Sequence, residues 1–118
     1  MRGMIWAAVV AACSGAVWAE EAAVDWVKVE KGAIEAALDD RKVRYALSEQ
    51  VFYASGKTLY DAGRPSWGNW REQNGQYCSE WPPNALWSCY DLYLSADGTQ
   101  VRFVGASGDK TDGVFVTE

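Results

Sequence analysis

The sequence predicts a mainly β domain: an antiparallel meander of about seven to eight short strands curled into a small barrel-like sheet, with one short N-terminal helix. Turn signals such as Asn74-Gly75 and Asp97-Gly98 recur between segments rich in valine, tyrosine, tryptophan and phenylalanine. Connections this short favour antiparallel pairing of consecutive strands. Aromatic side chains fall on both faces of the expected strands, which disfavours a flat sheet with one face in water.

Residues 1–19 have the pattern of a cleaved signal peptide. A positively charged start, Met1-Arg2-Gly3, precedes the apolar run Met4–Ala12, which is too short to span a bilayer. Val17-Trp18-Ala19 before Glu20 has the pattern of a cleavage site and would leave a single domain over residues 20–118. Alternatively, Val10–Cys13 resembles a lipobox, in which Cys13 carries a lipid anchor and becomes the mature N-terminus. A buried N-terminal helix is the third interpretation.

Export places the domain in the periplasm of a Gram-negative bacterium, or on a membrane if Cys13 is lipidated. The net charge of −5 becomes −6 when Arg2 is removed, which disfavours nucleic acid and anionic membrane surfaces as partners. The chain contains no histidine, so it cannot assemble a Ser-His-Asp or Cys-His relay. It also lacks a G-x-G-x-x-G or P-loop motif and a second apolar run long enough for a transmembrane span. We expect no cofactor and no metal.

The mature chain is expected to begin with a loose lead-in over residues 20–25. A helix of about two turns follows in "VEKGAIEAALDD", because Ile34, Ala37 and Leu38 share one helical face. We expect it to end at Asp39-Asp40. Eight strands are then predicted near Lys42–Leu47, Gln50–Ala54, Lys57–Asp61, Ser66–Glu72, Gln76–Trp81, Leu86–Leu94, Thr99–Val104 and Val114–Thr117.

The register of the central hairpins can be predicted from their turns. Asn74-Gly75 is the strongest hairpin signal because both residues accept the positive φ of a type I′ turn. Pairing about this turn places Trp70 opposite Ser79 and Arg71 opposite Cys78.

Cys78 and Cys89 are predicted to form a disulfide. A hairpin folded about Pro83-Asn84 places the two cysteines directly opposite each other, at a separation that a disulfide tolerates, and an oxidising compartment favours the bond. A redox-active pair is disfavoured because no C-x-x-C motif is present, and zinc is disfavoured because the chain has no histidine ligand.

Chaining these hairpins divides the side chains between two faces. The core face is predicted to hold Gly68, Trp70, Tyr77, Trp81, Leu86, Tyr90, Leu92 and Leu94. Gly68 leaves room there for the Trp81 indole. The opposite face mixes aromatic and polar groups, as sugar-binding and protein-binding surfaces do. Its candidate binding residues are Trp67, Arg71, Trp87, Asp91 and Tyr93. Alternatively, the helix covers this face, with Ile34 and Leu38 packed over the indoles.

The stretches "GRPSWGNWREQNGQYCSEWPPNALWSCYDLY" and "VRFVGASGDKTDGVF" resemble a group of small exported proteobacterial proteins with no settled activity. The shared features are a W-G-x-W strand, a Y-C-S-x-W-P-P segment, a C-Y after a short loop and a glycine-rich terminal hairpin, over about Gly32–Val116. The resemblance implies a cell-envelope location and the disulfide, and transfers no catalytic residue. In size, export and single cystine the chain is also similar to periplasmic β-barrel lysozyme inhibitors.

The sequence therefore favours a non-enzymatic envelope binding module, which holds a small molecule, a glycan or a protein on its aromatic face or in a barrel mouth. One alternative is an inhibitor of an envelope hydrolase such as a lysozyme, because an acidic domain can present a loop to a basic enzyme cleft. The other is a hydrolase that uses carboxylate and tyrosine chemistry, with Glu80, Asp91 and Tyr93 as its cluster.

Overall fold

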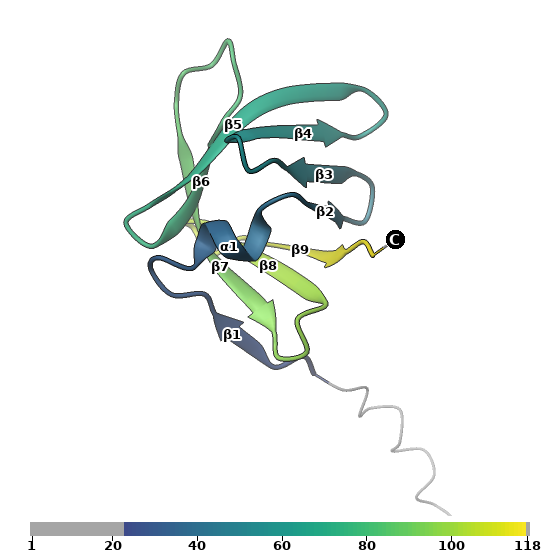
Figure 1. The fold of residues 1–118 in the computed structure, drawn as a ribbon, viewed down its shortest axis with the longest axis vertical. Helices are drawn as coiled ribbons and strands as arrows, with labels where there is room; N and C mark the ends of the chain where they lie inside the picture. Colours follow the sequence, from purple (N-terminus) through teal and green to yellow (C-terminus); the bar gives the residue numbers. More distant parts are fainter. Residues whose placement is uncertain (1–22, 118) are drawn as a thin grey trace, which may run out of the picture.

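The computed structural model describes residues 23–117, which form one antiparallel β barrel with a short helix (Figure 1). The elements in chain order are β1 (Trp26–Lys28), α1 (Ile34–Leu38), β2 (Arg41–Arg44), β3 (Glu49–Phe52), β4 (Lys57–Asp61), β5 (Pro65–Gln73), β6 (Gln76–Glu80), β7 (Ser88–Ser95), β8 (Gln100–Val104) and β9 (Lys110–Phe115). The predicted mainly β fold, with a single short helix before the meander, is confirmed.

Eight of the strands, β2 to β9, close into a barrel. Each pairs with its neighbour in sequence, and β9 returns to β2 through the pairs Val43–Phe115 and Arg44–Val114. The ninth strand, β1, pairs with the later part of β7. Trp26 pairs with Ser95 there, whereas β6 pairs with the beginning of β7. The sequence did not predict β1, because a three-residue strand carries too little periodicity to be recognised.

Helix α1 closes one end of the barrel. Ile34 and Leu38 are fully buried and belong to the same core as Phe52 and Trp70. Glu72 on β5 fastens the helix from the wall, since its carboxylate accepts the N–H groups of Gly32 and Ile34 at 2.5 and 3.2 Å. The buried residues of this core cluster are Val29, Ile34, Leu38, Val43, Phe52, Trp70, Tyr77, Leu92, Val101, Phe103 and Phe115.

The position of α1 corrects one of the two alternatives for the outer aromatic face. Ile34 and Leu38 point into the barrel instead of covering the outer indoles. The apolar stripe of the helix matches an opening at the barrel end, where it removes the most apolar surface from water.

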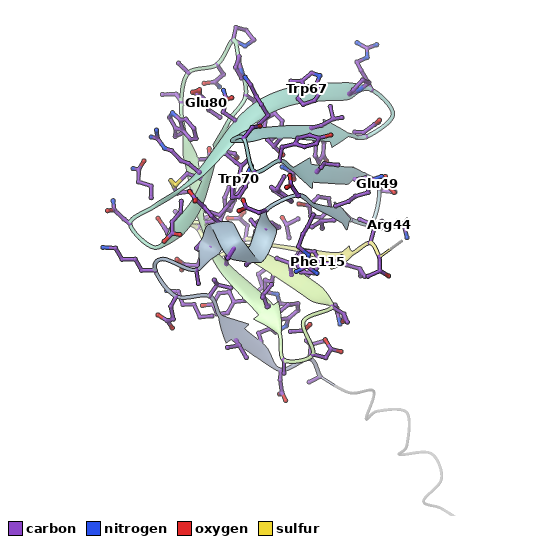
Figure 2. All side chains as sticks on the ribbon, in the orientation of Figure 1. Arg44, Glu49, Trp67, Trp70, Glu80 and Phe115 are labelled. Carbon is purple, nitrogen blue, oxygen red and sulfur yellow. A yellow bond between two sulfur atoms is a disulfide. The ribbon has the colours of Figure 1, made fainter. Side chains whose placement is uncertain are left out.

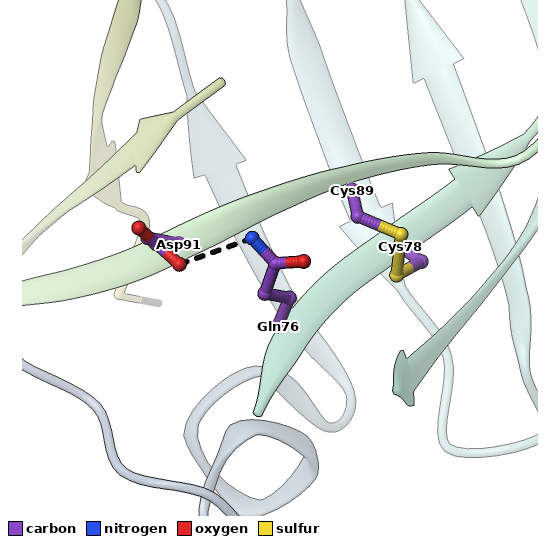
Figure 3. Close-up of a disulfide and its surroundings, with 4 residues drawn as sticks. All are labelled: Gln76, Cys78, Cys89 and Asp91. Carbon is purple, nitrogen blue, oxygen red and sulfur yellow. Dashed lines mark hydrogen bonds between the residues drawn. A yellow bond between two sulfur atoms is a disulfide. The ribbon is translucent and has the colours of Figure 1, made fainter. Parts of the chain in front are cut away.

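The predicted register of the central hairpins is confirmed. Trp70 pairs with Ser79, Arg71 with Cys78, and Cys78 with Cys89. The last pair forms the predicted disulfide, with 4.0 Å between the two Cα atoms (Figure 3). A Cβ on Gly68 would lie 2.5 Å from Cε3 of Trp81, so the absent side chain makes room for this indole as expected.

One residue assigned to the core face lies elsewhere. Leu86 is 76% exposed because β7 begins only at Ser88. The preceding loop turns away from the wall, with Asn84 N–H bonded to Trp81 O at 3.0 Å and Leu86 N–H bonded to Asn84 Oδ1 at 2.8 Å. The predicted strand was extended through a loop that has its own hydrogen bonds.

The predicted signal peptide and Cys13 lie outside the described residues. Within residues 23–117, no helix is long and apolar enough to cross a membrane.

Candidate functional site

The end of the barrel opposite α1 is an open mouth. Strands β2, β4, β6 and β8 all run toward this end, so the connections that follow them surround it. The other end carries α1 and the turns after β3, β5 and β7. The apolar plug and the mouth therefore lie at opposite ends of one barrel.

The mouth leads into a cavity of about 740 Å³. This volume is within the range of ~300–1,000 Å³ that is typical of small-molecule sites. The lining consists of Tyr45, Ala46, Leu47, Ser48, Gln50, Tyr60, Ser66, Tyr77, Ser79, Trp81, Tyr90, Phe103, Lys110, Thr111 and Asp112. Most of these residues are aromatic or carry a hydroxyl group.

Strand alternation brings the aromatic side chains together inside the barrel. Tyr77 and Tyr90 are cross-strand partners on the inward face of β6 and β7, and Phe103 reaches them from β8. The ring centroids of Tyr77 and Phe103 are 5.1 Å apart, and those of Tyr77 and Tyr90 are 6.1 Å apart. Tyr60 and Trp81, which also line the cavity, meet edge to face with centroids 6.1 Å apart. The cavity is therefore walled by rings.

Gln50 organises the polar part of this lining. It is 6% exposed, and its Nε2 donates to Thr58 Oγ1 at 2.9 Å and to the Tyr77 hydroxyl at 3.4 Å. Its Oε1 accepts the hydroxyl of Tyr45 at 2.8 Å. Thr58 in turn donates to the carbonyl of Val51 at 2.7 Å. A buried amide bonded in this way holds several hydroxyl groups in one arrangement.

The buried phenols of the cavity are neutral. Burial raises the pKa of Tyr77 to about 12, although hydrogen bonds to Ser79 and Gln50 oppose the shift. Burial also raises the pKa of Tyr45, with smaller contributions from the neighbouring Tyr77 and Tyr60. At neutral pH these groups donate and accept hydrogen bonds without carrying charge.

Charged groups of the lining lie at its rim, on β9. They are Lys110 and Asp112. The Asp112 carboxylate is engaged by the Arg102 guanidinium in two bonds of 2.7 and 2.8 Å. A bidentate pair of this kind holds the carboxylate toward the outer surface of β8 and β9.

The five candidate binding residues predicted from the sequence lie on the outside of the barrel. We call this set the outer wall; its members are Trp67, Arg71, Trp87, Asp91 and Tyr93. Trp67 is 57% exposed on β5, and its ring stacks on Tyr53 with centroids 5.9 Å apart (Figure 2). Arg71, on the same face of β5, places its guanidinium 3.8 Å from the centre of the Trp87 ring. Arg71 pairs with Cys78 of β6, and Trp87 directly precedes β7, so this stack joins β5 to the segment before β7.

Asp91 and Tyr93 continue the outer wall along β7. The Asp91 carboxylate accepts a hydrogen bond from the side-chain amide of Gln76 at 3.1 Å (Figure 3). It also lies 3.8 Å from Lys28 Nζ. Tyr93 pairs with Lys28 and with Arg102 on the adjacent strands. The cavity at the mouth is lined by none of these outer-wall residues. The role of these residues in binding stays a prediction.

The carboxylates of the hydrolase alternative are separated along β6. Glu80 lies at the mouth end of β6 and accepts the amide of Asn69 at 3.3 Å, whereas Asp91 is bonded to Gln76 at the start of the same strand. Four residues of strand separate these two levels by ~13 Å. The paired carboxylates of glycosidases are closer, at ~5–9.5 Å. The structure does not bring them together as a catalytic pair.

Sequence reasoning placed Tyr77, Trp81 and Tyr90 on the inward face but did not identify the cavity that they line. The available signal was the hydroxyl and amide content of inward positions near the mouth, at Gln50 and Ser79, where a filled barrel would have aliphatic side chains. This signal becomes visible only once each strand's inward face is known.

Within residues 23–117, no group of three histidine, cysteine, aspartate or glutamate side chains lies close enough to hold a metal ion. No protein-family model, curated protein or solved structure matches this chain.

Proposed function

We propose that this domain is an exported cell-envelope binding module that holds a small ligand in the mouth of its barrel. The observation that carries the proposal is the cavity of about 740 Å³, which is walled by rings and contains a few ordered polar groups. Apolar walls with a small number of placed hydrogen-bonding groups are typical of ligand sites. The five outer-wall residues do not line this cavity, so the alternative of a glycan or protein bound on the aromatic face draws no support from it.

Binding suits this cavity better than catalysis. Its deep groups are phenols, hydroxyls and one amide, and burial keeps the phenols of Tyr45 and Tyr77 protonated. The carboxylate at the rim, Asp112, is already held by Arg102. A general base must accept a proton near neutral pH, and neutral phenols do not. These groups provide orientation and apolar contact.

Two observations support an envelope location. The chain begins with the signal-peptide pattern described above, and Cys78 and Cys89 form a disulfide. Structural disulfides persist in oxidising compartments such as the periplasm.

The proposal is tested with N-phenyl-1-naphthylamine, a neutral dye whose fluorescence rises in apolar surroundings. We expect saturable binding to the purified domain. Ser66→Trp, which places an indole at the cavity mouth, should abolish it. The matched control is Ser55→Trp, which adds the same indole in the exposed β3–β4 turn at the plugged end and should bind like the wild type. Absence of saturable binding, or equal binding by both variants, contradicts the proposal.

A further inference from the structure

We infer that the ligand enters the barrel with an uncharged, planar end that carries a hydrogen-bond acceptor, and that the Tyr77 hydroxyl recognises this acceptor. The inference rests on the proposed binding function. It specifies the class of molecule, an aromatic or conjugated carbonyl compound or a chemically equivalent ether or N-heterocycle.

The first argument concerns the proton of the Tyr77 hydroxyl. Tyr77 is 4% exposed and lines the cavity. Its oxygen accepts the Gln50 amide N–H at 3.4 Å, a bond that uses an oxygen lone pair and leaves the hydroxyl proton unused. The Ser79 hydroxyl is the other hydrogen-bond partner of this oxygen, and like Gln50 it lowers the pKa of Tyr77, as a donor does, so both partners donate to the oxygen and neither receives the Tyr77 proton. A buried donor without an acceptor is costly, and an acceptor on a bound molecule removes that cost.

The second argument is that the nearby acceptors are committed elsewhere. Gln50 Oε1 already receives the hydroxyl of Tyr45, and Thr58 Oγ1 receives the Gln50 amide. The amide is held in this orientation from both sides, so it cannot rotate to receive the Tyr77 proton without breaking other bonds. The network therefore directs one donor toward the cavity.

The third argument concerns shape. The rings of Tyr90 and Phe103 flank Tyr77, with centroids 6.1 and 5.1 Å from it, and Trp81 and Tyr60 stand nearer the mouth. Flat rings stack and meet edge to face at such separations. A planar ligand that lies against these rings makes more contact with them than a branched aliphatic one.

The fourth argument concerns charge. The charged residues of the lining, Lys110 and Asp112, lie at the rim, and the deep groups are neutral. A charged end inserted beside Tyr77 would lose its hydration without an opposite charge to replace it. The inserted end is therefore uncharged.

The experiment compares two probes of similar shape, 2-acetonaphthone and naphthalene, as competitors of N-phenyl-1-naphthylamine. The wild type should bind 2-acetonaphthone roughly three- to tenfold more tightly, the range expected for one net hydrogen bond. Tyr77→Phe keeps the ring and removes the hydroxyl, so this preference should disappear. Tyr90→Phe, the matched control in the same cavity, should retain it. A third probe, 2-naphthoate, should bind more weakly than 2-acetonaphthone.

The outcomes separate this inference from the proposed function. Equal affinity of the wild type for the two neutral probes, or a preference that survives in Tyr77→Phe, overturns the inference while the dye result still supports a binding cavity. Tighter binding of 2-naphthoate overturns it as well. Absence of binding by the dye and all three probes overturns both. Circular dichroism checks that each variant folds. If Tyr77→Phe does not fold, the comparison of the three probes with the wild-type protein decides the question.

Discussion

The two ends of the barrel are filled in opposite ways. At the plugged end, Ile34 and Leu38 of α1 pack against Phe52 and Trp70, and all four side chains are buried. At the mouth, inward positions carry hydroxyl, amide and ring groups around a cavity of about 740 Å³. The same strands supply both ends.

This difference separates stability from binding within one small domain. Burial of apolar side chains is the main favourable term in folding, and it is concentrated where the helix closes the barrel. The mouth leaves surface unfilled, which costs stability and provides room for a ligand. Substitutions at the two ends should therefore have different consequences.

The largest difference is expected between two inward-facing tryptophans. Trp70 is buried, meets Phe52 edge to face at 5.7 Å, and donates its indole N–H to Tyr53 O at 2.9 Å. Trp70→Ala should lower the free energy of unfolding by about 3–5 kcal/mol. Trp81→Ala, at the partly open mouth, should cost about 1–2 kcal/mol and weaken dye binding. Urea unfolding of both variants measures this, and equal losses would show that the mouth contributes to stability as much as the plugged end.

An intermediate effect is expected where the helix is fastened to the wall. Glu72→Ala removes the acceptor of two backbone N–H groups and should cost about 1–2 kcal/mol, without changing dye affinity in the folded protein. The control is Glu49→Ala, which removes exposed ion pairs with Lys42 and Arg44 and should cost under about 1 kcal/mol. Thermal melts compare the two, and equal shifts would argue against a fastening role for Glu72.

The smallest effect is expected outside the barrel. Trp67→Ala should cost under about 1 kcal/mol, because the ring is more than half exposed, and it should leave dye binding unchanged. Denaturant unfolding and dye titration test both expectations. A loss of dye affinity in this variant would link the outer wall to the mouth and remove the distinction between them.

Much of the wall was predictable because its turns are strong local signals. Asn74-Gly75 sets the pairing of Trp70 with Ser79, since a two-residue turn leaves one register available. The cysteine positions indicated the next hairpin in the same way. The helix was predictable from the spacing of Ile34 and Leu38. These features depend on residues close together in sequence.

The chain by itself therefore determined strands β2 to β9, the central registers, the disulfide partners and the apolar face of the helix. Only the tertiary structure decided that β9 closes on β2, that α1 fills the barrel end instead of covering the outer wall, and that Gln50, Tyr77 and Tyr90 meet around a cavity. The reason is that closure and plugging depend on the curvature of the whole sheet, which sums small twists over all strands. No short segment of the sequence therefore predicts whether the sheet closes or which end the helix fills.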